Sequence, residues 1–133
     1  MIQLIIGDKG SGKTKMLVDL INESAANTTG SIVCIEKSMK LTYNISHSVR
    51  LLDVDEYGIS GYDMFFGFIS GVLAGNYDIS EVYIDGTLKI GGGTEGLGEL
   101  LDRLDEVMGD SIKAVITVST TADNLPDSVK KYL

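Results

Sequence analysis

Eight residues near the start of the chain constrain its fold more than any other segment. They read Gly7-Asp8-Lys9-Gly10-Ser11-Gly12-Lys13-Thr14 and match the pattern G-x-x-x-x-G-K-[ST]. Three glycines let the backbone turn with its N–H groups pointing inward, and such groups form a concave site for an anion. This geometry requires a strand before the loop and a helix after it.

The segments on both sides of the loop have the patterns that such a turn requires. Ile2 to Ile6 is an apolar run of strand length, and Lys13 to Ala26 carries an apolar stripe at helical spacing. Lys13 would supply positive charge for the outer phosphates of a nucleotide, and the Thr14 hydroxyl is placed to ligate Mg²⁺. The whole loop from Gly7 to Thr14 is therefore the predicted nucleotide-binding segment.

Strand and helix patterns alternate along the rest of the chain. Further strands are predicted at Ser31 to Glu36, Val49 to Val54, Glu81 to Asp85 and Ile112 to Ser119. Further helices are predicted at Tyr62 to Ala74, Glu95 to Met108 and Asp127 to Leu133, whereas residues 37–48 are ambiguous. Because this alternation requires crossover connections, we expect one α/β domain over residues 1–133, with a mostly parallel sheet of about five strands and helices on both faces.

The loop and its strand-helix context resemble the P-loop nucleoside triphosphatase superfamily, in which this loop is the Walker A motif. The resemblance implies a three-layer P-loop fold that binds ATP or GTP together with Mg²⁺. The arrangement also looks like small stand-alone bacterial ATP-binding proteins that are loosely grouped with twitching-motility ATPases. The His-containing and Asp-rich motifs of that secretion group are not visible, since the one histidine, His47, lies in a polar segment.

Members of this superfamily also place an aspartate at the end of an apolar strand, where its carboxylate orders the water shell of the magnesium. The run Val82-Tyr83-Ile84-Asp85 fits this pattern, so Asp85 is predicted as a metal residue together with Thr14. The segment Leu51 to Glu56 is the alternative, because it too is apolar and ends in carboxylates. A simple turn at Asp85-Gly86 remains a further interpretation.

Triphosphate cleavage needs a group that orients the attacking oxygen and positive charge that stabilises the transition state. Hydrolytic members of the branch with an extra strand often carry Glu directly after the magnesium-side Asp, where this chain has Gly86. Substitutes are expected at neighbouring strand ends, since ligands in open α/β sheets bind there. The candidates are Glu36, Asp55 with Glu56, and Ser119 with Thr120, and Lys13 and Asp85 complete the predicted catalytic set.

Positive charge for the transition state is scarce in this chain. Arg50 and Arg103 are the only arginines, and the arginine-bearing lid of small nucleotide kinases is not visible. An arginine finger is worth roughly 10³ to 10⁵ in rate. We therefore expect slow or partner-dependent hydrolysis.

Composition excludes several other classes of function. A net charge of -8 opposes non-specific binding to nucleic acid, which needs clustered Lys and Arg. The one cysteine, Cys34, lies in an apolar run and is predicted to be a buried thiol in a reducing cytoplasm. The uncharged stretch Met64 to Tyr77 is shorter than the roughly 17 to 25 residues that span a bilayer, so we expect a cytoplasmic protein without a membrane span.

Glycine recurs in two groups outside the loop. Gly67, Gly71 and Gly75 follow one side of the second predicted helix, where each costs about 1 kcal/mol relative to Ala. Close packing is the expected compensation, either against the protein's own sheet or against a partner helix or second copy. The other group follows Asp85 and predicts either a nucleotide-dependent switch or a disordered connection. Its members are Gly86, Gly91, Gly92, Gly93, Gly96 and Gly98.

Three functions are compatible with these features. The leading hypothesis is an Mg·ATP-binding P-loop protein with weak or partner-dependent ATPase activity. The second is a kinase-like phosphotransferase acting on a small hydroxyl substrate, with Glu36 or Asp55 as the base. The third is a non-enzymatic interaction module that binds nucleotide structurally or not at all.

Overall fold

The computed structural model describes residues 1–38, 41 and 44–133, and five strands of these residues form one sheet. The strands are β1 (Ile2–Gly7), β2 (Ser31–Glu36), β3 (Arg50–Asp53), β4 (Ile79–Ile84) and β5 (Lys113–Ser119). Their order is β1-β5-β4-β2-β3, and every pairing between these strands is parallel. The predicted α/β class with a parallel sheet is thereby confirmed.

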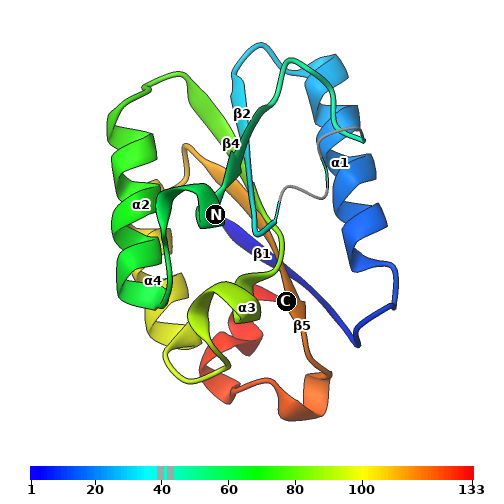
Figure 1. The fold of residues 1–133 in the computed structure, drawn as a ribbon, viewed down its shortest axis with the longest axis vertical. Coiled ribbons are helices and arrows are strands. Elements are labelled where there is room, and N and C mark those ends of the chain that lie inside the picture. Colours follow the sequence, from blue (N-terminus) through cyan, green and yellow to red (C-terminus); the bar gives the residue numbers. More distant parts are fainter. Residues whose placement is uncertain (39–40, 42–43) are drawn as a thin grey trace.

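Helices cover both faces of this sheet, as predicted. The helices are α1 (Lys13–Asn27), α2 (Tyr62–Ala74), α3 (Thr87–Gly91) and α4 (Leu97–Met108), with 3₁₀ turns η1 (Val54–Tyr57), η2 (Ala122–Asn124) and η3 (Asp127–Tyr132). Helix α1 lies on one side of the sheet, and α2 and α4 lie on the other (Figure 1). In the described part of the chain, no helix is long and apolar enough to cross a membrane.

Two apolar clusters hold these layers together, one on each face. Alternating side chains of a strand point to opposite faces, so Tyr83 of β4 packs in the cluster that contains Leu17 of α1. Its neighbour Ile84 packs in the cluster that contains Phe65 of α2 and Leu101 of α4. A strand covered on both faces reads as a continuous apolar run, which is why the central strands were recognisable from sequence.

Some predicted boundaries are wrong, and local backbone geometry explains them. Helix α4 begins at Leu97 and not at Glu95, because Gly96 has the left-handed φ of 85° and ends the preceding turn. The last segment is the 3₁₀ helix η3, and α3 was not predicted at all. Within the ambiguous segment 37–48, residues 39, 40, 42 and 43 lie outside the described residues.

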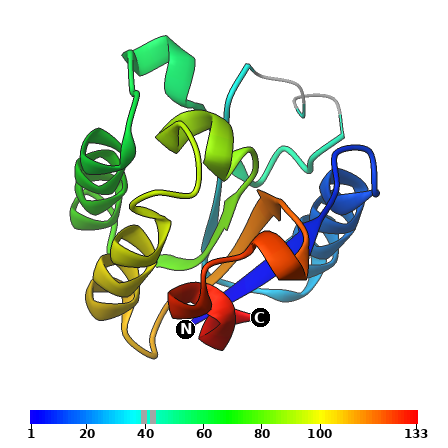
Figure 2. The ribbon, with the colours of Figure 1, turned by 90° about the horizontal axis from the view of Figure 1, so that it is seen from below.

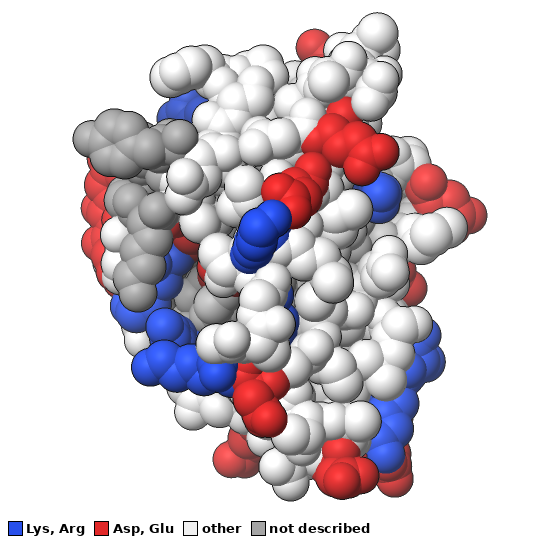
Figure 3. Space-filling model, turned by 90° about the vertical axis from the view of Figure 1, so that its right-hand side faces the viewer, with Lys and Arg blue, Asp and Glu red and all other residues white. Residues whose placement is uncertain are grey.

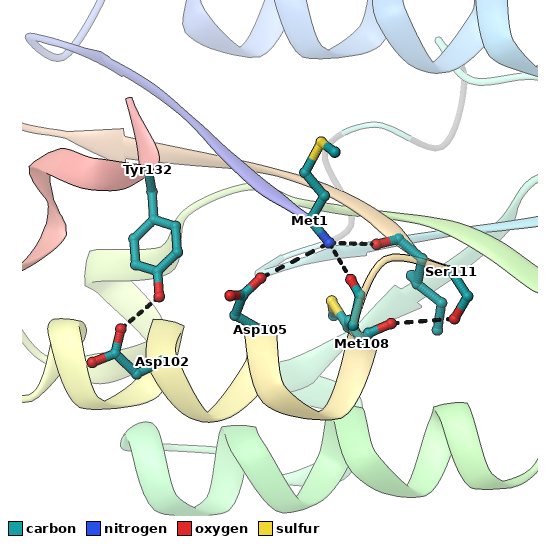
Figure 4. A network of polar contacts seen from close by, with 8 residues as sticks. Met1, Asp102, Asp105, Met108, Ser111 and Tyr132 are labelled. Carbon is teal, nitrogen blue, oxygen red and sulfur yellow. Dashed lines mark hydrogen bonds and ion pairs between the residues drawn. The ribbon is translucent and has the colours of Figure 1, made fainter.

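Both ends of the chain are fastened to α4 and the turn after it (Figure 4). The amino group of Met1 donates to the carbonyl oxygens of Gly109 at 2.6 Å and Ile112 at 2.9 Å. The Tyr132 hydroxyl donates to the Asp102 carboxylate at 2.5 Å. This hydrogen bond, aided by Lys131, lowers the pKa of Asp102. These contacts join β1 and η3 to one helix on the α2–α4 side.

The glycines of α2 do not pack against the sheet, so that interpretation is wrong. Gly67, Gly71 and Gly75 are all exposed. A Cβ built on Gly67 or Gly71 would meet no atom within 4 Å. Close packing inside the protein therefore does not compensate for these glycines, and their packing against a partner helix stays a prediction.

The glycines that follow Asp85 lie in and around α3 and in the turn into α4. They do not form a disordered connection. A Cβ on Gly91 would lie 2.0 Å from Cζ of Tyr62, so the ring needs a glycine there. The Tyr62 hydroxyl donates to the carbonyl oxygen of Gly93 at 2.5 Å. Burial raises the pKa of Tyr62 to about 12. The ring thus holds this segment against the start of α2.

The two glycine groups predict opposite effects of the same substitution. We expect Gly91→Ala to lower the free energy of unfolding by about 1–3 kcal/mol, because its methyl group collides with the Tyr62 ring. Gly67→Ala is the matched control in an exposed, open helical position, where we expect a gain of up to about 1 kcal/mol. Urea unfolding of both variants measures this, and equal effects of the two would contradict the assigned packing.

Candidate phosphate-binding site

The glycine loop joins β1 to α1 in a compact turn. Gly10 and Gly12 have φ values of 84° and 93°, which favour glycine. Gly7 is needed for space, because a Cβ there would lie 2.3 Å from Oγ of Ser11. Two hydrogen bonds to the carbonyl oxygen of Asp8 close the turn, from the Ser11 amide at 3.0 Å and the Lys13 ammonium at 2.9 Å.

The first turn of α1 leaves its backbone donors available to a ligand. Gly12 caps the helix without a side-chain hydrogen bond, and the first turn holds no acidic residue. The amide groups at a helix start carry partial positive charge and attract anions. The Lys13 side chain is buried beside them, so positive charge is concentrated where the loop meets the helix.

Asp85 lies directly beside the loop, although the sequence separates the two. The Thr14 hydroxyl donates toward the Asp85 carboxylate, at 3.2 Å from Oδ2 and 3.4 Å from Oδ1, across a separation of 71 residues. The backbone amide of Asp85 donates to the carbonyl oxygen of Ile35 on β2, and this hydrogen bond fixes the backbone where the chain leaves β4. The two residues that the sequence predicts as metal residues therefore lie in contact, and their roles remain predictions.

The alternative acidic segment lies elsewhere and has other partners. The Asp53 carboxylate accepts from the amides of Ser38 and Asp55, at 2.9 and 3.0 Å. Lys37 donates to the Asp55 carboxylate at 2.5 Å, and this hydrogen bond lowers the pKa of Asp55. These carboxylates therefore organise the turn after β3 and do not contact Thr14.

Thr117 is a residue of this site that sequence reasoning missed. Its hydroxyl, on a side chain only 2% exposed, donates to Oδ1 of Asp85 at 2.6 Å and accepts from the Gly86 amide at 3.3 Å. Strand β5 lies between β1 and β4 in the sheet, so Thr117 is on the strand between the one that leads into the loop and the one that leads into Asp85. A polar residue inside the apolar run of β5 was the available signal, but its meaning depends on the strand order.

The loop and the segment after β4 enclose a cavity of about 440 Å³ at the carboxyl ends of the strands, the edge seen in Figure 2. Its described lining residues are Lys9, Gly10, Gly12, Lys13, Thr14, Asp85, Gly86, Leu88, Lys89 and Ser119. Three of them are lysines and one is an aspartate, so the local charge opposes the net charge of -8. Acidic and basic side chains are interspersed on the side of the molecule that carries α1 (Figure 3).

A second hollow, of about 520 Å³, lies between α2 and the strands β2 and β3. Apolar side chains such as Leu52, Phe68 and Val72 supply much of its lining. Arg50 is its one cationic residue among those described. The loop cavity has both the backbone donors and the lysines that a phosphate group requires, and this hollow does not.

Glu36 lies at the end of β2, on the strand next to Asp85, but it does not line the cavity. Its side chain is 2% exposed, and both carboxylate oxygens accept from the Leu41 amide at 3.2 Å. Glu36 as a catalytic base therefore stays a prediction.

Cys34, two residues before Glu36, is fully buried as predicted. Burial raises the pKa of its thiol, and the Glu36 and Asp85 carboxylates add to that rise.

The spacing of the Thr14 and Asp85 oxygens is compatible with a magnesium ion. Mg²⁺ takes oxygen ligands at 2.0–2.1 Å in an octahedron, so neighbouring ligand atoms lie about 2.9 Å apart. The Thr14 and Asp85 oxygens, at 3.2 and 3.4 Å, are close to that spacing. Among the described residues, no three His, Cys, Asp or Glu side chains gather to hold a metal. Water and phosphate oxygens would supply the remaining ligands, as Mg²⁺ prefers.

Comparison with known proteins leaves this site to be interpreted from its own chemistry. A scan against protein-family models finds no family that matches the chain. A search among curated proteins also finds no match. The function is therefore inferred from the loop, the Thr14 and Asp85 pair and the charge of the cavity.

The Thr117 hydroxyl offers a test of how Asp85 is held. We expect Thr117→Val to lower the free energy of unfolding by about 1–3 kcal/mol, because the Asp85 carboxylate and the Gly86 amide lose a buried partner. Thr117→Ser keeps the hydroxyl and should retain more of that stability. Urea unfolding distinguishes the variants, and a Val variant as stable as the Ser variant would mean that this hydrogen bond contributes little.

Proposed function

We propose that this protein binds a nucleoside triphosphate together with Mg²⁺ in the cavity beside the glycine loop. The observation that carries the proposal is the contact between Thr14 and Asp85, which joins the end of the G-x-x-x-x-G-K-[ST] loop to the end of β4. A chance match to the loop pattern would not require a carboxylate at this position. The pair therefore supports assignment to the P-loop nucleoside triphosphatase superfamily and its three-layer fold.

Each part of the site has a definite task in this proposal. The amide groups of the loop and of the first turn of α1 bind the inner phosphates. Lys13 exchanges its hydrogen bond with the Asp8 carbonyl for one with a phosphate oxygen. Thr14 and Asp85 hold Mg²⁺, which when bound neutralises charge on the outer phosphates. ATP and GTP both satisfy these interactions.

The sheet topology supports the same location for the ligand. The chain leaves β1 toward α1 on one face and leaves β4 toward α3 and α4, which leads to the other face. Ligands of open α/β sheets bind in the crevice that such a divergence opens at the carboxyl ends of the strands. Strand β5 between β1 and β4 also agrees with the superfamily branch that has an extra strand.

Hydrolysis in this proposal is weak or depends on a partner. Gly86 stands where hydrolytic members of that branch often carry Glu, and Glu36 is buried against the Leu41 amide. No arginine lines the cavity among the described residues. Arg103 instead lies 3.9 Å from the centre of the Phe66 ring. A second chain would have to supply both the base and the cation for fast turnover.

The phosphotransferase alternative has less support from the site. Its candidate base Asp55 pairs with Lys37, and Glu36 holds a backbone amide. A product assay separates the possibilities, because hydrolysis releases free phosphate whereas transfer yields a phosphorylated acceptor. Phosphate transfer without release would favour the phosphotransferase over the ATPase.

Nucleotide binding predicts a specific gain in stability. We expect Mg·ATP at 100 times its dissociation constant to raise the free energy of unfolding by about 2.7 kcal/mol, since a ligand that binds only the folded state stabilises it. Lys13→Ala should lose most of this gain. Lys15→Ala is the matched control, because Lys15 is exposed on the same helix, pairs with Asp19 and does not line the cavity.

Urea unfolding with and without Mg·ATP measures the three proteins. The absence of a stability gain in the wild type, with GTP as well as with ATP, would exclude both nucleotide-dependent functions and leave the interaction module. A gain that survives Lys13→Ala would place the nucleotide elsewhere on the protein.

A further inference from the structure

Lys89 lines the cavity, and its charge has no ion-pair partner among the described residues. It lies in α3, four residues after Asp85, and its side chain is exposed and lines the cavity with Lys9 and Lys13. No described acidic residue forms an ion pair with it. A cation that faces a cavity without an acidic partner is available to an anionic ligand.

The protein holds α3 in place at both ends. At its start, the Gly86 amide donates to the Thr117 hydroxyl at 3.3 Å. At its end, the carbonyl oxygen of Ile90 accepts from the Gly61 amide at 2.9 Å, and the Tyr62 hydroxyl donates to Gly93. The backbone of Lys89 is therefore fixed in the cavity wall, while its four-carbon side chain keeps its reach.

The position of Lys89 relates it to the outer end of a bound triphosphate. In the proposed function the loop amides bind the inner phosphates, and Thr14 and Asp85 would hold Mg²⁺, which would neutralise charge on the outer ones. Lys89 belongs to the wall that Asp85 begins, and not to the loop. In the proposed function the terminal phosphate lies beside Asp85, so Lys89, which lines the cavity four residues further along that wall, is within reach of it through its long side chain.

We propose that Lys89 contacts the terminal phosphate and makes the site distinguish a nucleoside triphosphate from a diphosphate. This inference rests on the proposed function. A competing role for the same charge is to offset Asp85, which lines the same cavity. That role would change the affinities for triphosphate and diphosphate by the same factor, because Asp85 is present in both complexes.

Dissociation constants for a non-hydrolysable ATP analogue and for ADP, each with Mg²⁺, test the proposal by calorimetric titration. We expect Lys89→Ala to weaken binding of the ATP analogue by about tenfold, the loss of one exposed charge-assisted hydrogen bond. ADP affinity should stay within about twofold, since ADP lacks the group contacted. Lys89→Arg should restore discrimination, and Lys113→Ala at the amino end of β5 is the charge-matched control.

The outcomes separate this inference from the function on which it rests. Equal weakening of both ligands, or no change in either, would overturn the role of Lys89 while leaving nucleotide binding in place. Wild-type protein that binds neither ligand would overturn both. Urea unfolding of Lys89→Ala verifies that the variant is folded, which its exposed side chain leads us to expect.

Discussion

The hydrogen bond from Thr14 to Asp85 is the interaction on which the site depends. It connects the end of the glycine loop to the end of β4 across the intervening strand β5, and Thr117 supports the carboxylate from that strand. Thr14 is held by the first turn of α1, whereas Asp85 is held by Thr117 of β5 and by the Ile35 carbonyl of β2. Contacts within the protein therefore set the position of both oxygens, and such preorganisation would reduce the cost of binding a charged group.

Sequence patterns predicted the layers of this fold because its strands are covered on both sides. Apolar runs such as β2, and Val82 to Ile84 within β4, are typical of strands buried in a parallel sheet. They do not determine the strand order, since β5 is last in the chain but lies between β1 and β4. The short helix α3 was missed because its five residues are too few to show a helical period.

The difference between local sequence pattern and strand order also explains which parts of the site could be predicted. The loop is contiguous, and Asp85 ends a recognisable strand, so both were predictable from local pattern. Lys89 depends on α3, which no local pattern marks. Thr117 is a polar residue inside an apolar run, but its place beside Asp85 depends on the strand order. Lys89 matters because it adds positive charge to the cavity of a protein with a net charge of -8. The long-range field opposes an anionic ligand, and the backbone amides, lysines and Mg²⁺ would have to overcome it.

A crystal structure of the protein grown with Mg²⁺ and a non-hydrolysable ATP analogue tests this account most directly. The account predicts inner phosphates surrounded by the amides of residues 10–14, and Mg²⁺ at about 2.1 Å from Oγ1 of Thr14 with Asp85 beside it. A nucleotide bound in the apolar hollow beneath α2, or a metal ion that touches neither Thr14 nor Asp85, would contradict the account.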